Sequence, residues 1–105
     1  MPDYGFYTQI YLGTAIPEKA FPAFLGKAKA YLDRYKRSYR VQGGENAEGL
    51  ALCAMAETLY RFDGREGLKS MNLGGVQVHY DDSALRREVY RAACIYLDIY
   101  RGVAG

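Results

Sequence analysis

The chain has 105 residues, of which 50% are hydrophobic and 25% charged, so it fits one domain with one core and is not a wholly disordered chain. Its 14 Lys and Arg against 12 Asp and Glu leave a formal net charge of +2, and this balance indicates neither a nucleic acid nor a membrane as partner. The eleven tyrosines are unusual, because tyrosine is enriched where one protein contacts another.

The N-terminal part of the chain has helical spacing. Apolar residues three and four apart predict a short helix over Tyr4–Leu12. Proline is tolerated in the first turn of a helix, so Pro17 and Pro22 place the start of the next helix near residues 17–19. This second helix carries a 3.6-residue apolar stripe made of Phe21, Phe24, Leu25, Ala28, Tyr31, Leu32, Tyr35 and Tyr39.

A third helix follows Gly43-Gly44, with Asn46 as its N-terminal cap. Its middle, from Leu50 to Phe62, is apolar on nearly every side, and such a helix must be covered on every side. Either it is the centre of the bundle or part of it contacts another subunit. We expect Asp63-Gly64 and Gly67 to end it.

The next stretch, Leu68–Tyr80, changes from a period of 3.6 to a period of two. A Gly-Gly turn then predicts a β-hairpin with one apolar face. The pairs on that face, across Gly74-Gly75, are Leu73 with Val76 and Met71 with Val78. A lone hairpin is marginal in water and has unpaired edges, so we expect a helix, a strand or another chain to cover it.

Asp81-Asp82-Ser83 then caps a last helix, with carboxylates at its positive end. Its apolar stripe begins at Leu85 and reaches Tyr100, and Tyr90, Ile95 and Ile99 widen it, before Gly102 ends the helix. The sequence therefore predicts a mainly α single domain over residues 1–105. It is a small bundle of three to four helices with one β-hairpin between the last two helices.

Export, membrane insertion and disulfides are not expected. No basic stretch precedes an apolar run at the N-terminus, so we expect no signal peptide. The longest apolar run, Leu50–Ala56, is far shorter than the ~20 residues of a membrane helix. Cys53 and Cys94 lie in apolar, helix-like stretches without a CxxC pair, so we interpret both as buried reduced thiols. Reduced cysteines are typical of a protein that is synthesised in the cytosol and stays reduced there.

No arrangement of residues predicts catalysis. His79 is the only histidine, and no Ser or Cys nucleophile lies at a known spacing from it. Helix capping explains the Asp81-Asp82 pair, and the two Gly-Gly pairs lack the sequence context of a phosphate-binding loop. We expect a protein that is not an enzyme, with no catalytic residue, cofactor or metal ion.

The basic run from Arg34 to Arg40 is interleaved with tyrosines, a combination that suits phosphate contacts and base stacking. It makes a small helical nucleic-acid-binding regulator the alternative function, with contacts from Arg34, Lys36, Arg37 and Arg40. The simpler interpretation is a helix C-terminus, where cations complement the helix dipole and the tyrosines belong to the apolar stripe.

The order and spacing of several stretches resemble the head–tail connector, or adaptor, proteins of tailed bacteriophages and prophages. The resemblance covers Tyr4 to Val103. The matching stretches are Ile16-Pro17-Glu18 before Phe21, Ala28 to Asp33, Ala54 to Glu57, Tyr60-Arg61, Arg65 to Ser70, Gly74 to Tyr80, and Tyr96-Leu97 to Val103. One departure is Arg37 to Gly44, where the family commonly has a Thr-containing turn, so no loop contact is carried over there.

The resemblance implies a helical structural subunit of the virion, located at the head–tail junction and assembled in the cytoplasm of the bacterial host. Its partners would be other copies of itself, in a closed ring of about twelve. They would also include the portal protein above and the head-closure and tail proteins below. DNA would pass through the channel without sequence recognition, and no membrane would be involved.

A ring requires two different complementary patches on each subunit. We assign the first to the apolar face of the predicted hairpin, which can also add a strand to a neighbour. Its residues are Met71, Leu73, Val76, Val78 and Tyr80. The opposing patch is assigned to Tyr90, Tyr96 and Tyr100.

Overall fold

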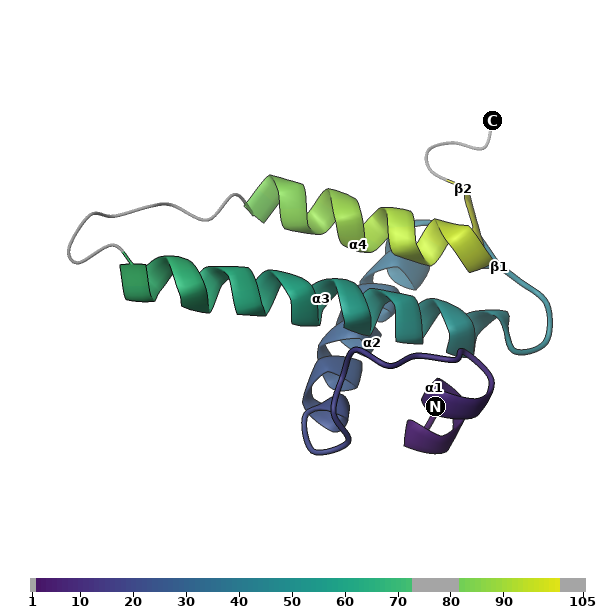
Figure 1. The fold of residues 1–105 in the computed structure, drawn as a ribbon. Helices are drawn as coiled ribbons and strands as arrows, with labels where there is room; N and C mark the ends of the chain where they lie inside the picture. The colour runs from purple at the N-terminus through teal and green to yellow at the C-terminus, as the bar shows by residue number, and fades with distance from the viewer. Residues whose placement is uncertain (1, 73–81, 101–105) are drawn as a thin grey trace.

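The computed structural model describes residues 2–72 and 82–100, with their side chains except those of residues 64–72 and 82. It is a mainly helical compact domain of four helices, three of them long, with a two-stranded antiparallel sheet (Figure 1). The elements are α1 (Tyr4–Gln9), α2 (Phe21–Ser38), β1 (Arg40–Gln42), α3 (Ala47–Asn72), α4 (Asp82–Tyr96) and β2 (Asp98–Tyr100). The prediction of a mainly α bundle is confirmed.

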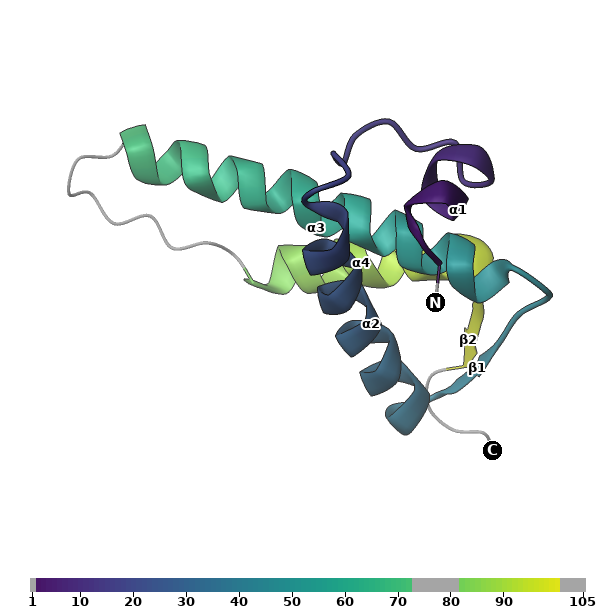
Figure 2. The ribbon, with the colours of Figure 1, turned by 90° about the horizontal axis from the view of Figure 1, so that it is seen from below.

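Helices α3 and α4 run side by side in opposite directions, and α2 crosses them steeply (Figures 1 and 2). Helix α1 lies against the first turns of α3, where the Phe6 ring packs over Gly49. A Cβ at Gly49 would come within 2.8 Å of that ring. This approach therefore depends on glycine.

The N-terminal helices lie near their predicted positions. The side chain of Asp3 caps α1, where its carboxylate accepts a hydrogen bond from the Phe6 amide at 2.8 Å. The predicted start of α2 near residues 17–19 is wrong, because residues 18–20 form a turn and the helix begins at Phe21. Pro22 thus occupies the second helical position, where the N–H that it lacks would have no partner inside the helix.

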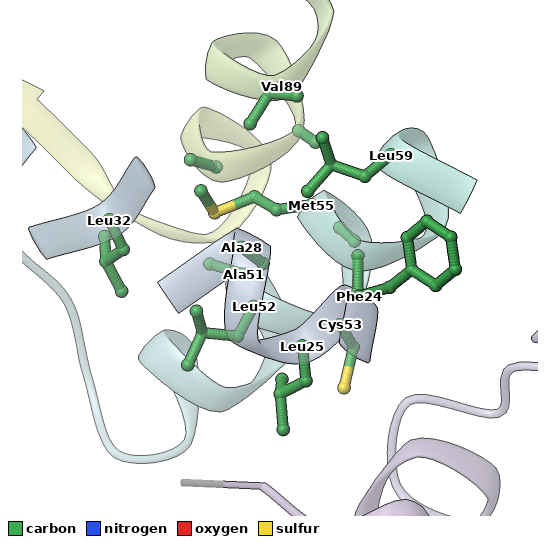
Figure 3. Packing of buried hydrophobic residues seen from close by; sticks show 14 of the residues in the cluster. Phe24, Leu25, Ala28, Leu32, Ala51, Leu52, Cys53, Met55, Leu59 and Val89 are labelled. Carbon is green, nitrogen blue, oxygen red and sulfur yellow. The ribbon is translucent and has the colours of Figure 1, made fainter. Parts of the chain in front are cut away.

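Helix α3 is the centre of the bundle. Its segment Ala51–Ala56, together with Leu59, is buried on all sides by α1, α2 and α4. Figure 3 shows α2 residues on one side of α3 and Val89 of α4 on the other. Of the two explanations for an all-round apolar helix, the structure selects the internal one. Burial of this segment requires no second subunit.

The placement of a hairpin between the last two helices is wrong for its first arm. Helix α3 continues through Gly64 and Gly67 to Asn72, so residues 68–72 are helical. A glycine inside a helix costs about 1 kcal/mol relative to alanine but keeps its N–H donor, so these two positions do not end the helix. The Gly-Gly turn and the second arm, residues 73–81, lie outside the described residues.

The observed sheet joins two segments that the sequence did not mark as strands. Strand β1 pairs antiparallel with β2, with Arg40 opposite Tyr100, Val41 opposite Ile99 and Gln42 opposite Asp98. The pair fixes the end of α2 to the end of α4 (Figure 2). Close packing continues at Gly43, where a Cβ would come within 2.6 Å of the Leu97 side chain.

Candidate functional site

The most distinctive surface feature is a groove between α2 and α4, with a volume of about 330 Å³. Residues three and four apart form its α2 wall and continue into the residue after that helix, and residues of the first turns of α4 form the other wall. We call it the tyrosine–arginine groove. Its lining residues are Tyr31, Arg34, Tyr35, Ser38, Tyr39, Arg86, Arg87 and Tyr90.

Among the described residues, the lining of the groove contains three arginines and no acidic residue. Among the described residues, no carboxylate lies within ion-pair distance of Arg34, Arg86 or Arg87. Three other basic side chains on the same two helices have such a partner. The pairs are Lys29 with Asp33 at 2.9 Å, Lys36 with Glu48 at 2.7 Å and Arg91 with Glu88 at 3.1 Å. The groove therefore concentrates positive charge that its own walls do not neutralise.

The tyrosines of the groove pack on one another. The Tyr35 ring meets the Tyr90 ring edge to face, with centroids 5.5 Å apart. The guanidinium of Arg34 lies 5.8 Å from the centre of the Tyr31 ring. Burial raises the pKa of Tyr35 to about 12, so its hydroxyl keeps its proton at neutral pH.

Only one of the four basic residues predicted from the sequence lines the groove. Arg34 lines the groove, whereas Lys36 pairs with Glu48 of α3. Arg37 and Arg40 are exposed and do not line the groove. Sequence reasoning missed Arg86-Arg87, because the last helix was analysed only for its acidic cap and its apolar stripe. The Arg-Arg pair in the first turns of α4 was the available signal.

The predicted interface residues are only partly described. Leu73, Val76, Val78 and Tyr80 lie outside the described residues, as does His79, and Met71 lies on α3 with its side chain not described.

The opposing patch is described in full. Tyr90 and Tyr96 are half-buried, and Tyr96 meets the Tyr11 ring at 6.3 Å, whereas Tyr100 is 53% exposed. The structure does not gather these three side chains into one exposed patch.

Large apolar side chains remain exposed at the end of the molecule where Tyr11 of the segment after α1 meets Tyr96 of α4. Ile10 and Leu12, the chain neighbours of Tyr11, are 52% and 72% exposed. Ile95, which precedes Tyr96, is 69% exposed. We call Ile10, Leu12 and Ile95, the exposed chain neighbours of the Tyr11–Tyr96 contact, the apolar end patch. Sequence reasoning assigned Ile95 to the widened buried stripe of the last helix, and that assignment is wrong.

A second group of tyrosines, the closed tyrosine cluster, surrounds a carboxylate inside the fold. Tyr7 donates a hydrogen bond to Glu57 Oε2 at 2.7 Å, and Tyr11 donates to Oε1 at 3.2 Å. The Tyr7 hydroxyl also accepts from the amides of Ala15 and Ile16, both at 2.9 Å. The cluster thereby fixes α1 and the following loop onto α3. Its bonds are made within the chain, so we assign it a structural role.

The two cysteines differ. Cys53 is buried in the core, and burial raises the pKa of its thiol to about 12. Cys94 is exposed, so the prediction that both thiols are buried is wrong for this residue. Its position on α4 faces away from the core, because the buried stripe of that helix is formed by Val89, Ala92 and Ala93.

Within the described residues, no group of three or more His, Cys, Asp or Glu side chains is placed to hold a metal ion. In the same residues, no helix has the length and apolar character to cross a membrane. Comparison of the chain with models of protein families, with curated proteins and with solved structures finds no match.

Proposed function

We propose that this chain is a structural subunit of a phage or prophage head–tail connector, which assembles into a ring beneath the portal and joins the DNA-filled head to the tail. The order and spacing of the matching stretches from Tyr4 to Val103 support this role. The mainly helical fold agrees with the fold class that the resemblance implies.

The observation that carries the proposal on the structural side is the apolar end patch. Ile10, Leu12 and Ile95 are all more than half exposed in the isolated subunit. Large exposed apolar side chains on a small domain are typical of a surface that another protein covers. Because the Ala51–Ala56 segment of α3 is covered by its own chain, we infer that contacts between copies use this end of the molecule and not that segment.

Self-association tests the proposal directly. We expect light scattering to show a rise in mass with protein concentration, and negative-stain micrographs to show rings, alone or after addition of the portal protein encoded in the same genome. A strict monomer that also fails to bind that portal protein contradicts the proposal.

A pair of variants assigns the contact to the apolar end patch. Ile95→Glu adds a charge to an exposed side chain, so we expect it to block assembly while circular dichroism stays that of a folded helical domain. The control Ala30→Glu adds the same charge at an exposed position of α2 and should assemble normally. Equal assembly of Ile95→Glu and the wild type would show that this end is not the contact.

A further inference from the structure

We propose that the tyrosine–arginine groove is a docking site for a carboxylate-rich segment of a partner protein. The proposal does not depend on ring assembly, since it rests on the residues of one subunit. The walls of the groove are positively charged. Arg34 of α2 lines the groove together with Arg86 and Arg87 of α4, and the described residues contribute no carboxylate to its lining.

The cations of the groove are all arginines, and arginine is suited to binding carboxylates. A guanidinium has five N–H donors in a planar fork that matches a carboxylate or a phosphate in a bidentate manner. A partner that supplies two or three carboxylates along one short segment satisfies three guanidinium groups that stand on two neighbouring helices. Electrostatic complementarity of this kind also fixes the register of the segment in the groove.

The packing of the tyrosine rings favours an acidic protein segment over a nucleic acid as the ligand of the groove. Proteins bind single-stranded nucleic acids by stacking bases on free aromatic faces beside a positively charged groove. Here the rings already have neighbours, because Arg34 lies over Tyr31 and Tyr35 packs edge to face with Tyr90. The rings therefore serve as packed walls, and the three arginines, which have no carboxylate partner among the described residues, remain to recognise a ligand. This arrangement favours carboxylates on a peptide over stacked bases.

The direct test measures binding of a fluorescein-labelled oligoglutamate peptide by fluorescence anisotropy, with the matched oligoglutamine peptide as the uncharged control. We expect the wild type to bind the glutamate peptide and not the glutamine peptide. Hydrogen bonds between charged groups contribute substantially to the free energy of binding. We therefore expect the double variant Arg86→Gln/Arg87→Gln to bind the glutamate peptide about tenfold more weakly than the wild type.

A matched variant removes the same charge elsewhere. The double variant Arg37→Gln/Arg40→Gln takes two exposed arginines from the basic run, and neither lines the groove. We expect its affinity for the glutamate peptide to change by less than about twofold, since surface charges away from a site act only weakly through solvent. An equal loss in both double variants overturns the proposal, because binding would then follow net charge and not the groove.

Two further outcomes also overturn it. One is a wild-type protein that does not bind the glutamate peptide. The other is a labelled oligothymidylate that binds more tightly than the peptide and loses affinity in the Arg86→Gln/Arg87→Gln variant, which would assign the groove to nucleic acid. Thermal unfolding confirms that each variant is folded, and Arg34→Gln tests the opposite wall of the groove should the α4 variant fail to fold.

Discussion

Tyrosine has different roles in the closed tyrosine cluster and in the tyrosine–arginine groove. In the closed cluster, Tyr7 is fully buried, and its hydroxyl is bonded to Glu57 and to two backbone amides. In the groove, tyrosines form walls beside three arginines, and the structure gives the Tyr35 hydroxyl no hydrogen-bond partner among the described residues. The closed cluster has a carboxylate that accepts hydrogen bonds from tyrosines of the same chain. The groove has three arginines that form no ion pair with a described carboxylate.

This difference shows why a high tyrosine content does not by itself locate an interface. A tyrosine has an apolar ring and a polar tip, so it serves equally well inside the fold when a partner for the hydroxyl is present. The charged residues that accompany the rings separate the two uses. Tyrosines around an internally bonded carboxylate hold the fold together, whereas tyrosines beside arginines that have no carboxylate partner among the described residues leave a surface for a ligand.

The largest expected effect comes from removing one hydroxyl from each site. Tyr7→Phe deletes the acceptor of two amides and a donor to Glu57, so we expect a loss of about 2–4 kcal/mol in the free energy of unfolding. Tyr35→Phe should change that free energy by less than about 0.5 kcal/mol. Urea unfolding of both variants measures the difference. Equal losses would show that the two sites do not differ in how their hydroxyls contribute.

Alkaline pH provides the next test. Burial and the hydrogen bond to Glu57 raise the pKa of Tyr7 to about 12. A tyrosine in the unfolded chain has a pKa near 10, so the stabilisation is complete below pH 10 and is lost as the pH rises from about 10 to about 12. For Tyr7 the loss is on the order of 2–3 kcal/mol.

Burial raises the pKa of Tyr35 in the same direction, so both sites lose stability in this window. Unfolding free energies measured across it should fall more gently in Tyr7→Phe than in the wild type. An unchanged pH profile in Tyr7→Phe would contradict the assignment of this titration to Tyr7.

A glycine tests the packing of the closed cluster. A Cβ at Gly13 would come within 2.1 Å of the Tyr7 ring, so Gly13→Ala should destabilise the protein by about 1–3 kcal/mol. The control is Gly26→Ala, because Gly26 lies on α2 with open space around it. That change should stabilise the protein by about 0.5–1 kcal/mol. Thermal unfolding should therefore shift in opposite directions, and a matching shift would contradict the packing of Tyr7 against Gly13.

The smallest expected effect is on the reactivity of the two thiols, which is measured on the native protein without a mutation. Cys53 lies in the buried core near Glu57, and Cys94 lies exposed on α4 near Tyr35. The thiolate is the reactive form, so a thiol reagent should modify Cys94 in the native protein and reach Cys53 only after unfolding. Mass spectrometry counts the added groups. Native Cys94→Ser should then remain unmodified.

Much of the helical framework was predictable from local signals. The 3.6-residue stripe of α2 and the start of α4 after an acidic cap follow from side-chain periodicity and capping, which act within a few residues. The end of α3 was mispredicted because Leu68 and Met71, three apart, fit a helix as well as the start of an alternating strand. Two glycines were taken as an end to the helix, although glycine weakens a helix without breaking it.

The candidate site could be predicted only in part. Arg34 was found because it stands in a basic run, whereas Arg86 and Arg87 come close to it only through the crossing of α2 and α4. Lys36 belongs to the same run but points to Glu48 of α3. Residues one or two positions apart on a helix face different directions, so a run of charges in sequence is not a patch in space.

The sequence by itself determined that this protein is mainly helical and that one helix is apolar on nearly every side, because periodicity and apolar composition are properties of neighbouring residues. The tertiary structure decided which chain covers that helix, which three-residue segments pair as β1 and β2, and which arginines share a groove. Each of these results joins residues far apart along the chain. Their pairing depends on how the helices pack, and packing is settled by the whole core at once.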